Sequence, residues 1–281
     1  MRLGGVVFGW NDAESWAMKH VEKGFGAAYW PLGPDASREE EQAFVDAARR
    51  YNIVIAEVGG WCNLLEQDPI KREQNIRYDI ARLQTAERVG AHCCVNISGS
   101  HDPQWDAPHP RNLTPETFDT VVKNAQRIID ESGVKNAFFS YEPMPWMYPT
   151  GTEETRQLIE AVNRPNFGVH VDMANMMNTP RRVYENAAFT REYLTAFAGK
   201  IHSIHAKDTR LFKTLTTHIE ECDPGTGEFD FDTLLTQADR LGDVCIMLEH
   251  MQTEEQFDKA AAHICACSRR LGLTFTKAEV R

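Results

Sequence analysis

The sequence lacks a surplus of basic residues, a long apolar run and an N-terminal signal pattern. Its 281 residues contain 30 Lys and Arg against 41 Asp and Glu, which gives a formal net charge of −11. A nucleic-acid partner requires a basic surface, so we expect none. No run approaches the roughly 18 apolar residues that span a bilayer, and no charged-then-apolar stretch opens the chain. We therefore expect a cytoplasmic protein without a membrane partner.

The cysteines also lack the spacing of a metal finger. The seven cysteines include no C-x-x-C pair, which argues against a zinc ribbon and against a thioredoxin-type site. Free thiols, buried or half-buried, are what such isolated cysteines usually become. This use of cysteine fits a reducing compartment.

Strand-like and helix-like patterns alternate along the chain without a change in composition. We predict strands at 2–8, 26–31, 53–59, 91–98, 136–142, 167–172, 201–206 and 243–249, and helices at 12–24, 37–51, 71–89, 114–132, 152–163, 183–198, 229–241 and 253–271. Eight such units close a parallel (β/α)₈ barrel of about 250 residues. A doubly wound sheet is the rival, but no glycine-rich dinucleotide turn follows the first strand. The prediction is an α/β TIM barrel, a single domain over residues 1–281.

Four consecutive predicted strands end in side chains that can bind a cation. Glu142 and Asp172 end strands five and six, and His205 and Glu249 end strands seven and eight. In such barrels the chemistry lies at the carboxyl ends of the strands. The period of two places the apolar residues of the last strand on the face opposite Glu249, and strand six gives the same phase for Asp172. We therefore predict that the polar ends point into the barrel and converge.

Three carboxylates and one imidazole form a hard ligand set that suits Mn²⁺, Mg²⁺ or Co²⁺. We expect one divalent cation at these four residues, with Mn²⁺ favoured. Such an ion would stabilise an ene-diolate formed from a bound sugar. Glu142 and Glu249 would then serve opposite faces of the reacting carbon, one removing a proton and the other returning it.

Short motifs surround these strand ends. They are Tyr141-Glu142-Pro143, Val171-Asp172, His205-Ala-Lys-Asp208, Pro224-Gly-Thr-Gly-Glu-Phe-Asp230 and Leu248-Glu249-His250. Together they resemble the xylose isomerase-like TIM barrels, which include ketose 3-epimerases, inosose dehydratases and inosose isomerases. The resemblance implies that the same four residues bind the metal, that the two glutamates form the acid–base pair, and that the chain assembles as a dimer or tetramer. Asn175 departs from the pattern, because many epimerases carry a histidine there, and we expect it to bind a substrate hydroxyl.

Aromatic residues follow the strand ends and are candidates for the walls of a pocket. Tryptophans come after strands one to five, as Trp10, Trp30, Trp61, Trp105 and Trp146. Because indole faces stack on the apolar faces of sugars and on aromatic aglycones, we assign Trp10, Trp61, Trp105 and Trp146 to substrate binding.

Charged and polar residues in the loops complete the predicted site. His101, in the loop after strand four, is a candidate general base or a ligand of a substrate hydroxyl. Lys207 is expected to pair with a site carboxylate or to contact substrate, and Arg210 to hold a distal hydroxyl or acidic group. The sequence leaves open whether the 211–228 loop is a lid.

The leading hypothesis is a metal-dependent sugar isomerase or epimerase. The alternative is a metal-dependent lyase on a keto sugar, either an inosose-type dehydratase or the catalytic subunit of a 3-keto C-glycoside deglycosidase. We expect a homo-oligomer, with a hetero-oligomer as the alternative assembly. A non-catalytic sugar-binding barrel is a third reading. The endonuclease branch of the same family is disfavoured by the acidic charge, and because the resemblance gives that branch about three zinc ions and more histidines.

Overall fold

The computed structural model describes residues 1–280. Apart from two short strands within 208–222, its strands and helices fall within or close to the predicted stretches. The strands are β1 (Arg2–Gly4), β2 (Ala27–Tyr29), β3 (Val54–Gly59), β4 (Cys93–Asn96), β5 (Phe138–Tyr141), β6 (Val169–Asp172), β7 (Ile201–Ala206), β8 (Asp208–Leu211), β9 (Ile219–Cys222) and β10 (Cys245–Leu248). The helices are α1 (Ala13–Lys23), α2 (Arg38–Arg50), α3 (Pro69–Val89), α4 (Pro115–Ser132), α5 (Thr152–Val162), α6 (Pro180–Tyr184), α7 (Asn186–Ala196), α8 (Phe231–Asp239) and α9 (Glu254–Arg270). None of these helices has the length and apolar character needed to cross a membrane.

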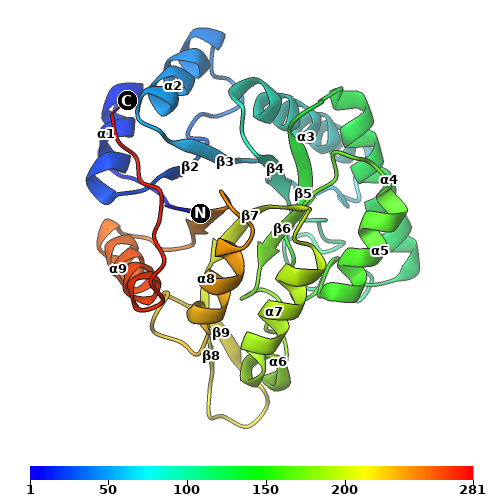
Figure 1. Cartoon of the computed structure of the whole chain (residues 1–281). Coiled ribbons are helices and arrows are strands. Elements are labelled where there is room, and N and C mark those ends of the chain that lie inside the picture. The colour runs from blue at the N-terminus through cyan, green and yellow to red at the C-terminus, as the bar shows by residue number, and fades with distance from the viewer. Residues whose placement is uncertain (281) are drawn as a thin grey trace.

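Eight of the strands form one parallel sheet that curls into a barrel (Figure 1). Neighbours follow the order β5, β4, β3, β2, β1, β10, β7, β6. The two end strands meet where Phe139 pairs in parallel with Phe167, and the Phe139 N–H donates to the Asn166 carbonyl at 2.8 Å. Helices lie around the outside of this ring. The predicted (β/α)₈ TIM barrel is confirmed.

Two segments differ from the prediction in detail. The helix predicted over 183–198 is two helices, α6 and α7, that meet at Glu185, which has a non-helical backbone. The first of these begins early because Pro180 occupies its first turn and the Thr179 side chain caps the Arg182 N–H. The predicted 211–228 loop contains a strand, β9, which pairs antiparallel with β8 to form a hairpin.

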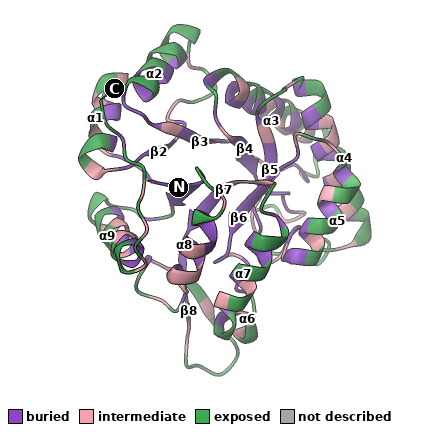
Figure 2. Ribbon diagram, viewed as in Figure 1, coloured by how far each residue is buried: buried purple, intermediate pink, exposed green. Residues whose placement is uncertain are grey.

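The core has an outer layer and an inner layer, and Figure 2 shows the barrel strands as mostly buried. Ile246 and Leu248 of β10 belong to the large cluster that includes the helices, whereas Cys245 and Met247 pack inside the barrel. Glu249 continues the inward face of that strand, because side chains alternate along it. The predicted phase of the last strand is therefore the observed one.

Asp208 fixes the turn that follows the hairpin. Its carboxylate accepts four backbone N–H groups, from Thr209 and Phe229 on Oδ1 and from Gly225 and Gly227 on Oδ2, at 2.8 to 3.0 Å. A Cβ at residue 227 would lie 2.3 Å from this carboxylate, so only glycine fits there. The Pro224–Asp230 motif is thus a structural clasp that holds the hairpin against the barrel.

Candidate metal centre

The four predicted ligands stand on four adjacent strands at one end of the barrel. Asp172 is the last residue of β6 and pairs in register with His205 of β7, which pairs in turn with Met247 of β10. Glu142 and Glu249 directly follow β5 and β10. The Glu142 N–H donates to the Asn96 carbonyl at 2.8 Å, so the β4–β5 ladder extends to this residue and fixes its direction. The register of these strands therefore brings all four side chains together at one end of the barrel.

Each of the four offers one ligand atom, and these atoms all lie within 4.8 Å of one another. The His205 Nδ1 atom lies 2.8 Å from Glu249 Oε2, 3.1 Å from Glu142 Oε1 and 3.6 Å from Asp172 Oδ2. All four residues are buried except Glu249, which is partly exposed towards the cavity described below. The arrangement is that of ligands around a common point rather than of separate ion pairs.

Lys207 brings a positive charge into the same cluster. Its Nζ atom lies 2.8 Å from Asp172 Oδ2, 3.0 Å from Glu249 Oε2 and 3.5 Å from Glu142 Oε1. Burial disfavours the charged amine, but the surrounding carboxylates raise the pKa of Lys207 well above its ordinary value. The predicted pairing of Lys207 with a site carboxylate is observed.

The carboxyl groups respond to these neighbours in opposite ways. Burial, together with the charge of Glu249, raises the pKa of Glu142. Burial acts in the same direction on Asp172 and Glu249, but the cationic Lys207 and His205 outweigh it and lower both pKa values. Burial likewise opposes the imidazolium of His205, but Glu249 and the other nearby anions raise the pKa of His205 well above its ordinary value.

The donor set fits a hard divalent cation. Among the described residues, the buried Asp172 Oδ2 and Glu249 Oε2 atoms accept no well-aligned hydrogen bond, although cationic nitrogens lie 2.8 to 3.0 Å away. Buried carboxylate oxygens normally have such partners, so these two have lone pairs free for an ion. Carboxylate oxygens with one imidazole nitrogen are the ligands that Mn²⁺, Mg²⁺ and Co²⁺ accept.

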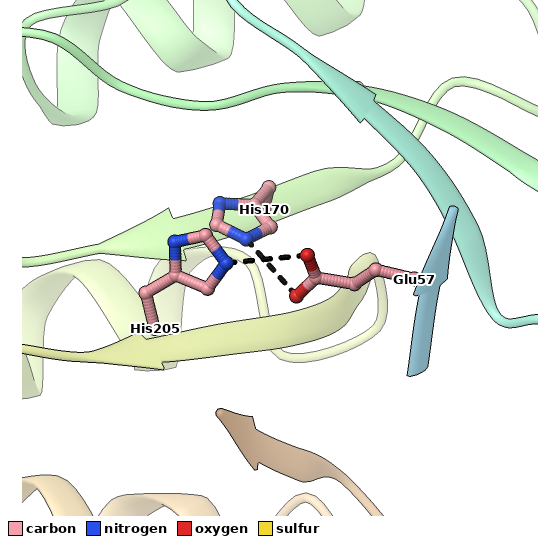
Figure 3. A group of neighbouring side chains, drawn as sticks. All are labelled: Glu57, His170 and His205. Carbon is pink, nitrogen blue, oxygen red and sulfur yellow. Dashed lines mark hydrogen bonds and ion pairs between the residues drawn. The ribbon is translucent and has the colours of Figure 1, made fainter. Parts of the chain in front are cut away.

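A second polar layer lies beneath the cluster, inside the barrel (Figure 3). The Glu57 carboxylate from β3 lies 3.2 Å from His205 Nε2 and 3.3 Å from His170 Nε2, and the Ser203 hydroxyl donates to it. Our sequence prediction did not include Glu57 and gave His170 no role. One signal was present, since Glu57 is the single charged residue of an otherwise apolar predicted strand.

A cavity of about 820 Å³ opens above the cluster. Its lining includes Glu142, Glu249, Asn175, Trp61, Trp105 and Trp146, with Met144, Met177 and Ile219 among the apolar residues. The Asn175 side chain donates to Glu142 Oε1 at 3.2 Å, and its backbone N–H donates to Asp172 Oδ1 at 2.8 Å. The Trp146 indole N–H donates to the Asp106 carbonyl at 2.8 Å, which holds that ring in the wall.

Three predicted site residues lie elsewhere and are not among the described residues that line the cavity. Trp10 donates its indole N–H to the Val7 carbonyl and packs edge-on against Phe44. The His101 Nε2 atom bonds the Thr117 hydroxyl at 2.9 Å. The exposed Arg210 donates to the carbonyl of the clasp residue Thr226.

The hairpin forms one wall of the cavity. Thr209 of β8, Thr217, and Ile219, Glu220 and Glu221 of β9 all line it. Glu221 also bonds the His250 Nδ1 atom at 3.0 Å, which joins the hairpin to the residue after Glu249. The 211–228 loop therefore covers the site from one side.

Comparisons with known proteins agree with this geometry. The fold is similar to D-psicose 3-epimerase from Clostridium cellulolyticum, at a TM-score of 0.70 and 14% identity over 98% of this chain and 100% of that one. It is also similar to endonuclease IV from Thermus thermophilus, at a TM-score of 0.72 and 15% identity over 96% and 100% of the two chains. At such identities these likenesses show the fold alone.

Sequence comparison adds a curated relative and a family. The chain is 24% identical over 185 residues to the probable endonuclease 4 of Persephonella marina, a match that covers 63% of this chain and only 62% of that relative. The family described as xylose isomerase-like TIM barrel matches residues 11–267. That match spans the whole ring of ligands, and the chain therefore belongs to the xylose isomerase-like TIM barrel family.

Proposed function

We propose that this chain is a divalent-metal-dependent sugar isomerase or epimerase that transfers a proton at the carbon next to a carbonyl. The observation that carries the proposal is the pair Glu142 and Glu249, whose carboxylates belong to one cluster that could hold a cation, at the floor of a tryptophan-walled cavity. The similar fold of D-psicose 3-epimerase supports a small sugar as substrate. Mn²⁺ is the favoured ion, with Mg²⁺ or Co²⁺ as alternatives.

The two glutamates reach the site from two strands that are not neighbours in the barrel. In the barrel, β6 and β7 separate β5 from β10, so Asp172 and His205 lie between Glu142 and Glu249. One carboxylate removes the proton from one face of the sugar carbon, and the other returns a proton to the opposite face. A bound divalent cation would supply Lewis-acid stabilisation of the negative charge on the sugar oxygens. Asn175, hydrogen-bonded to Glu142, orients that carboxylate and contacts a substrate hydroxyl.

A lyase acting on a keto glycoside is the second candidate, and the size of the cavity favours it. A volume of about 820 Å³ lies in the upper part of the range of roughly 300–1,000 Å³ that suits drug-sized ligands, and a free monosaccharide needs much less. Trp61, Trp105 and Trp146 offer faces for a planar aglycone. No Lys or Arg is among the described residues lining the cavity, which favours an uncharged substrate over a phosphorylated one.

The likeness to endonucleases does not carry over to a DNA substrate in this proposal. The described cavity lining is acidic, with Asp106, Glu220 and Glu221 in addition to the cluster. Phosphate backbones are bound through basic side chains, and the chain carries a net charge of −11.

Incorporation of solvent deuterium tests the proposal directly. Metal-loaded protein is incubated in deuterated water with free, phosphorylated and aryl-linked keto sugars, and label at the carbon next to the carbonyl is measured by mass spectrometry. We expect Glu142→Gln and Glu249→Gln each to slow incorporation by about 10²–10⁴-fold, because a proton donor or acceptor is removed. Asp79→Asn, the same change at a buried carboxylate on α3 outside the cluster, serves as the matched control.

Three results would separate the candidates. Reversible label exchange that depends on both glutamates supports the isomerase or epimerase. Release of an aglycone or of an unsaturated sugar identifies the lyase. Wild-type incorporation by both glutamine variants would contradict the proposed acid–base pair.

A further inference from the structure

The imidazole of His205 stands between three carboxylates on one side and a single carboxylate on the other. Its Nδ1 atom faces Glu142, Asp172 and Glu249. Its Nε2 atom lies 3.2 Å from Glu57 Oε2, and Figure 3 shows this contact. Neighbouring rings hold this orientation, since Tyr29 and His170 both pack against His205 at near-perpendicular angles, with ring centroids 6.0 Å and 4.1 Å away. One ring nitrogen therefore faces the carboxylate cluster, and the other faces Glu57 in the polar layer beneath it.

Glu57 is itself held in a fixed position. It is 1% exposed, the Ser203 hydroxyl donates to its Oε1 atom, and His170 Nε2 lies 3.3 Å from the same oxygen. The strand that carries it is irregular, because Ala28 pairs with Ile55 whereas the next residue, Tyr29, pairs with Glu57. This shift turns both Ala56 and Glu57 inward, which regular alternation would not do.

These contacts decide which nitrogen of His205 is free. A neutral imidazole has one N–H, and an ionised carboxylate can only accept a hydrogen bond. In the metal-free cluster Nδ1 lies 2.8 Å from Glu249 Oε2, so that nitrogen also carries a proton. A bound divalent cation would replace the Nδ1 proton, and the contact with Glu57 would keep the remaining proton on Nε2 and leave the Nδ1 lone pair for the ion. An outer carboxylate that orients a histidine in this way also makes it a more basic ligand.

We propose that Glu57 is the positioning residue of the metal centre: it fixes His205 in the tautomer whose Nδ1 atom binds the divalent cation. The inference rests on the metal site of the proposed function and not on the reaction. Glu57, His170 and His205 also form a compact group that could itself accept an ion. The Ser203 and His205 contacts already occupy the Glu57 oxygens, so we assign this group to hydrogen bonding.

Two measurements test the assignment. In Mg²⁺-loaded wild-type protein, long-range ¹H–¹⁵N correlations are expected to show His205 protonated at Nε2 and unprotonated at Nδ1. In Glu57→Gln, the side-chain amide can donate to Nε2 and stabilise the opposite tautomer, so the affinity for Mn²⁺ should fall by about 10- to 100-fold. Free Mn²⁺ measured by electron paramagnetic resonance gives that affinity without any substrate.

Asp79→Asn is the matched control, since it makes the same change at a fully buried carboxylate that does not contact His205. We expect it to bind Mn²⁺ like the wild type, and circular dichroism verifies that both variants fold. If Glu57→Gln does not fold, the wild-type tautomer decides alone.

Three results would overturn the proposal. The first is a proton on Nδ1 of His205 in the metal-loaded wild type, and the second is unchanged Mn²⁺ affinity in folded Glu57→Gln. The third is a wild-type protein that binds two ions, of which Glu57→Gln loses one, because Glu57 would then itself be a metal ligand. Failure of the proposed reaction would appear instead as absent deuterium incorporation with these binding results intact.

Discussion

Asp208 and Asp172 are both buried aspartates at the same end of the barrel, yet their surroundings differ in kind. Both oxygens of Asp208 are saturated by backbone N–H groups. Asp172 accepts one such bond, from Asn175, and its other oxygen faces the ammonium of Lys207 without an aligned hydrogen bond. Burial is the same in both, at 1% and 0% exposure. What distinguishes a structural carboxylate from a candidate ligand here is where its lone pairs point.

The largest effect expected from this contrast is on metal binding. Asp172→Asn removes a charged ligand, so we expect Mn²⁺ affinity to fall by more than the roughly 100-fold that loss of an outer partner can cause. The metal-free variant should remain folded, because the Asn175 N–H can still be accepted by the amide oxygen. Calorimetric titration with Mn²⁺ measures the change, and an affinity near that of wild type would remove Asp172 from the ligand set.

Asp208→Asn is the counterpart and should act on stability. An amide nitrogen would face the two partly buried N–H groups that now donate to Oδ2, so both donors lose their acceptor at a cost of about 3 kcal/mol in total. Urea unfolding of metal-free protein measures this loss, with Mn²⁺ affinity per folded molecule expected to stay close to wild type. The contrast between the two aspartates breaks down if Asp208→Asn is as stable as wild type.

The same contrast explains how much could be predicted from sequence. The alternation of strands and helices gives the barrel, and the strand-end rule gives Glu142, Asp172, His205 and Glu249, because regular alternation decides where these side chains point. Glu57 was missed because its direction depends on a register shift between β2 and β3, which is a property of two strands together.

Loop residues show the other limit of sequence reasoning. Trp61 and Trp146 line the cavity, but Trp10 follows a strand in the same way and packs instead against α2 through Phe44. Arg210 directs its guanidinium to the clasp, whereas its neighbour Thr209 lines the cavity. Side chains beyond a strand end follow loop conformation, which short-range sequence patterns do not encode.

A third buried aspartate, Asp79, has fewer hydrogen bonds than Asp208. Among the described residues it has no ion pair like that between Asp172 and Lys207. We expect its titration to make stability depend on pH. It accepts a hydrogen bond from Asn96 at 2.9 Å, but burial dominates and raises the pKa of Asp79 from its ordinary value of 3.8 to about 7. Between these values the folded protein holds a proton that the unfolded chain releases. The contribution of Asp79 therefore becomes more destabilising as pH rises from about 4 to 7, and it is constant above that range.

Asp79→Asn removes this titration. Relative to wild type, the variant should gain about 2.5 kcal/mol of unfolding free energy between pH 5 and pH 8, from roughly 1.4 kcal/mol per unit of pKa difference. Urea unfolding of both proteins at the two pH values gives the difference directly. Parallel pH profiles for the two proteins would show that Asp79 is ionised when buried, as Asp172 is.

The smallest expected effect concerns Lys207, whose ammonium lies among the carboxylate oxygens of the cluster. Lys207→Met keeps the volume of the side chain but removes an ammonium 2.8 to 3.5 Å from Asp172, Glu249 and Glu142. A divalent ion then no longer competes with that charge, so Mn²⁺ should bind about tenfold tighter, while the metal-free protein loses stability through repulsion among the carboxylates. Titration with Mn²⁺ and unfolding with and without the ion measure the two opposing changes. Weaker Mn²⁺ binding by a folded Lys207→Met variant would instead mean that Lys207 holds the carboxylates in place for the metal. The position of Asp172 Oδ2 would then depend on its ion pair with Lys207 rather than on the geometry of the barrel strands.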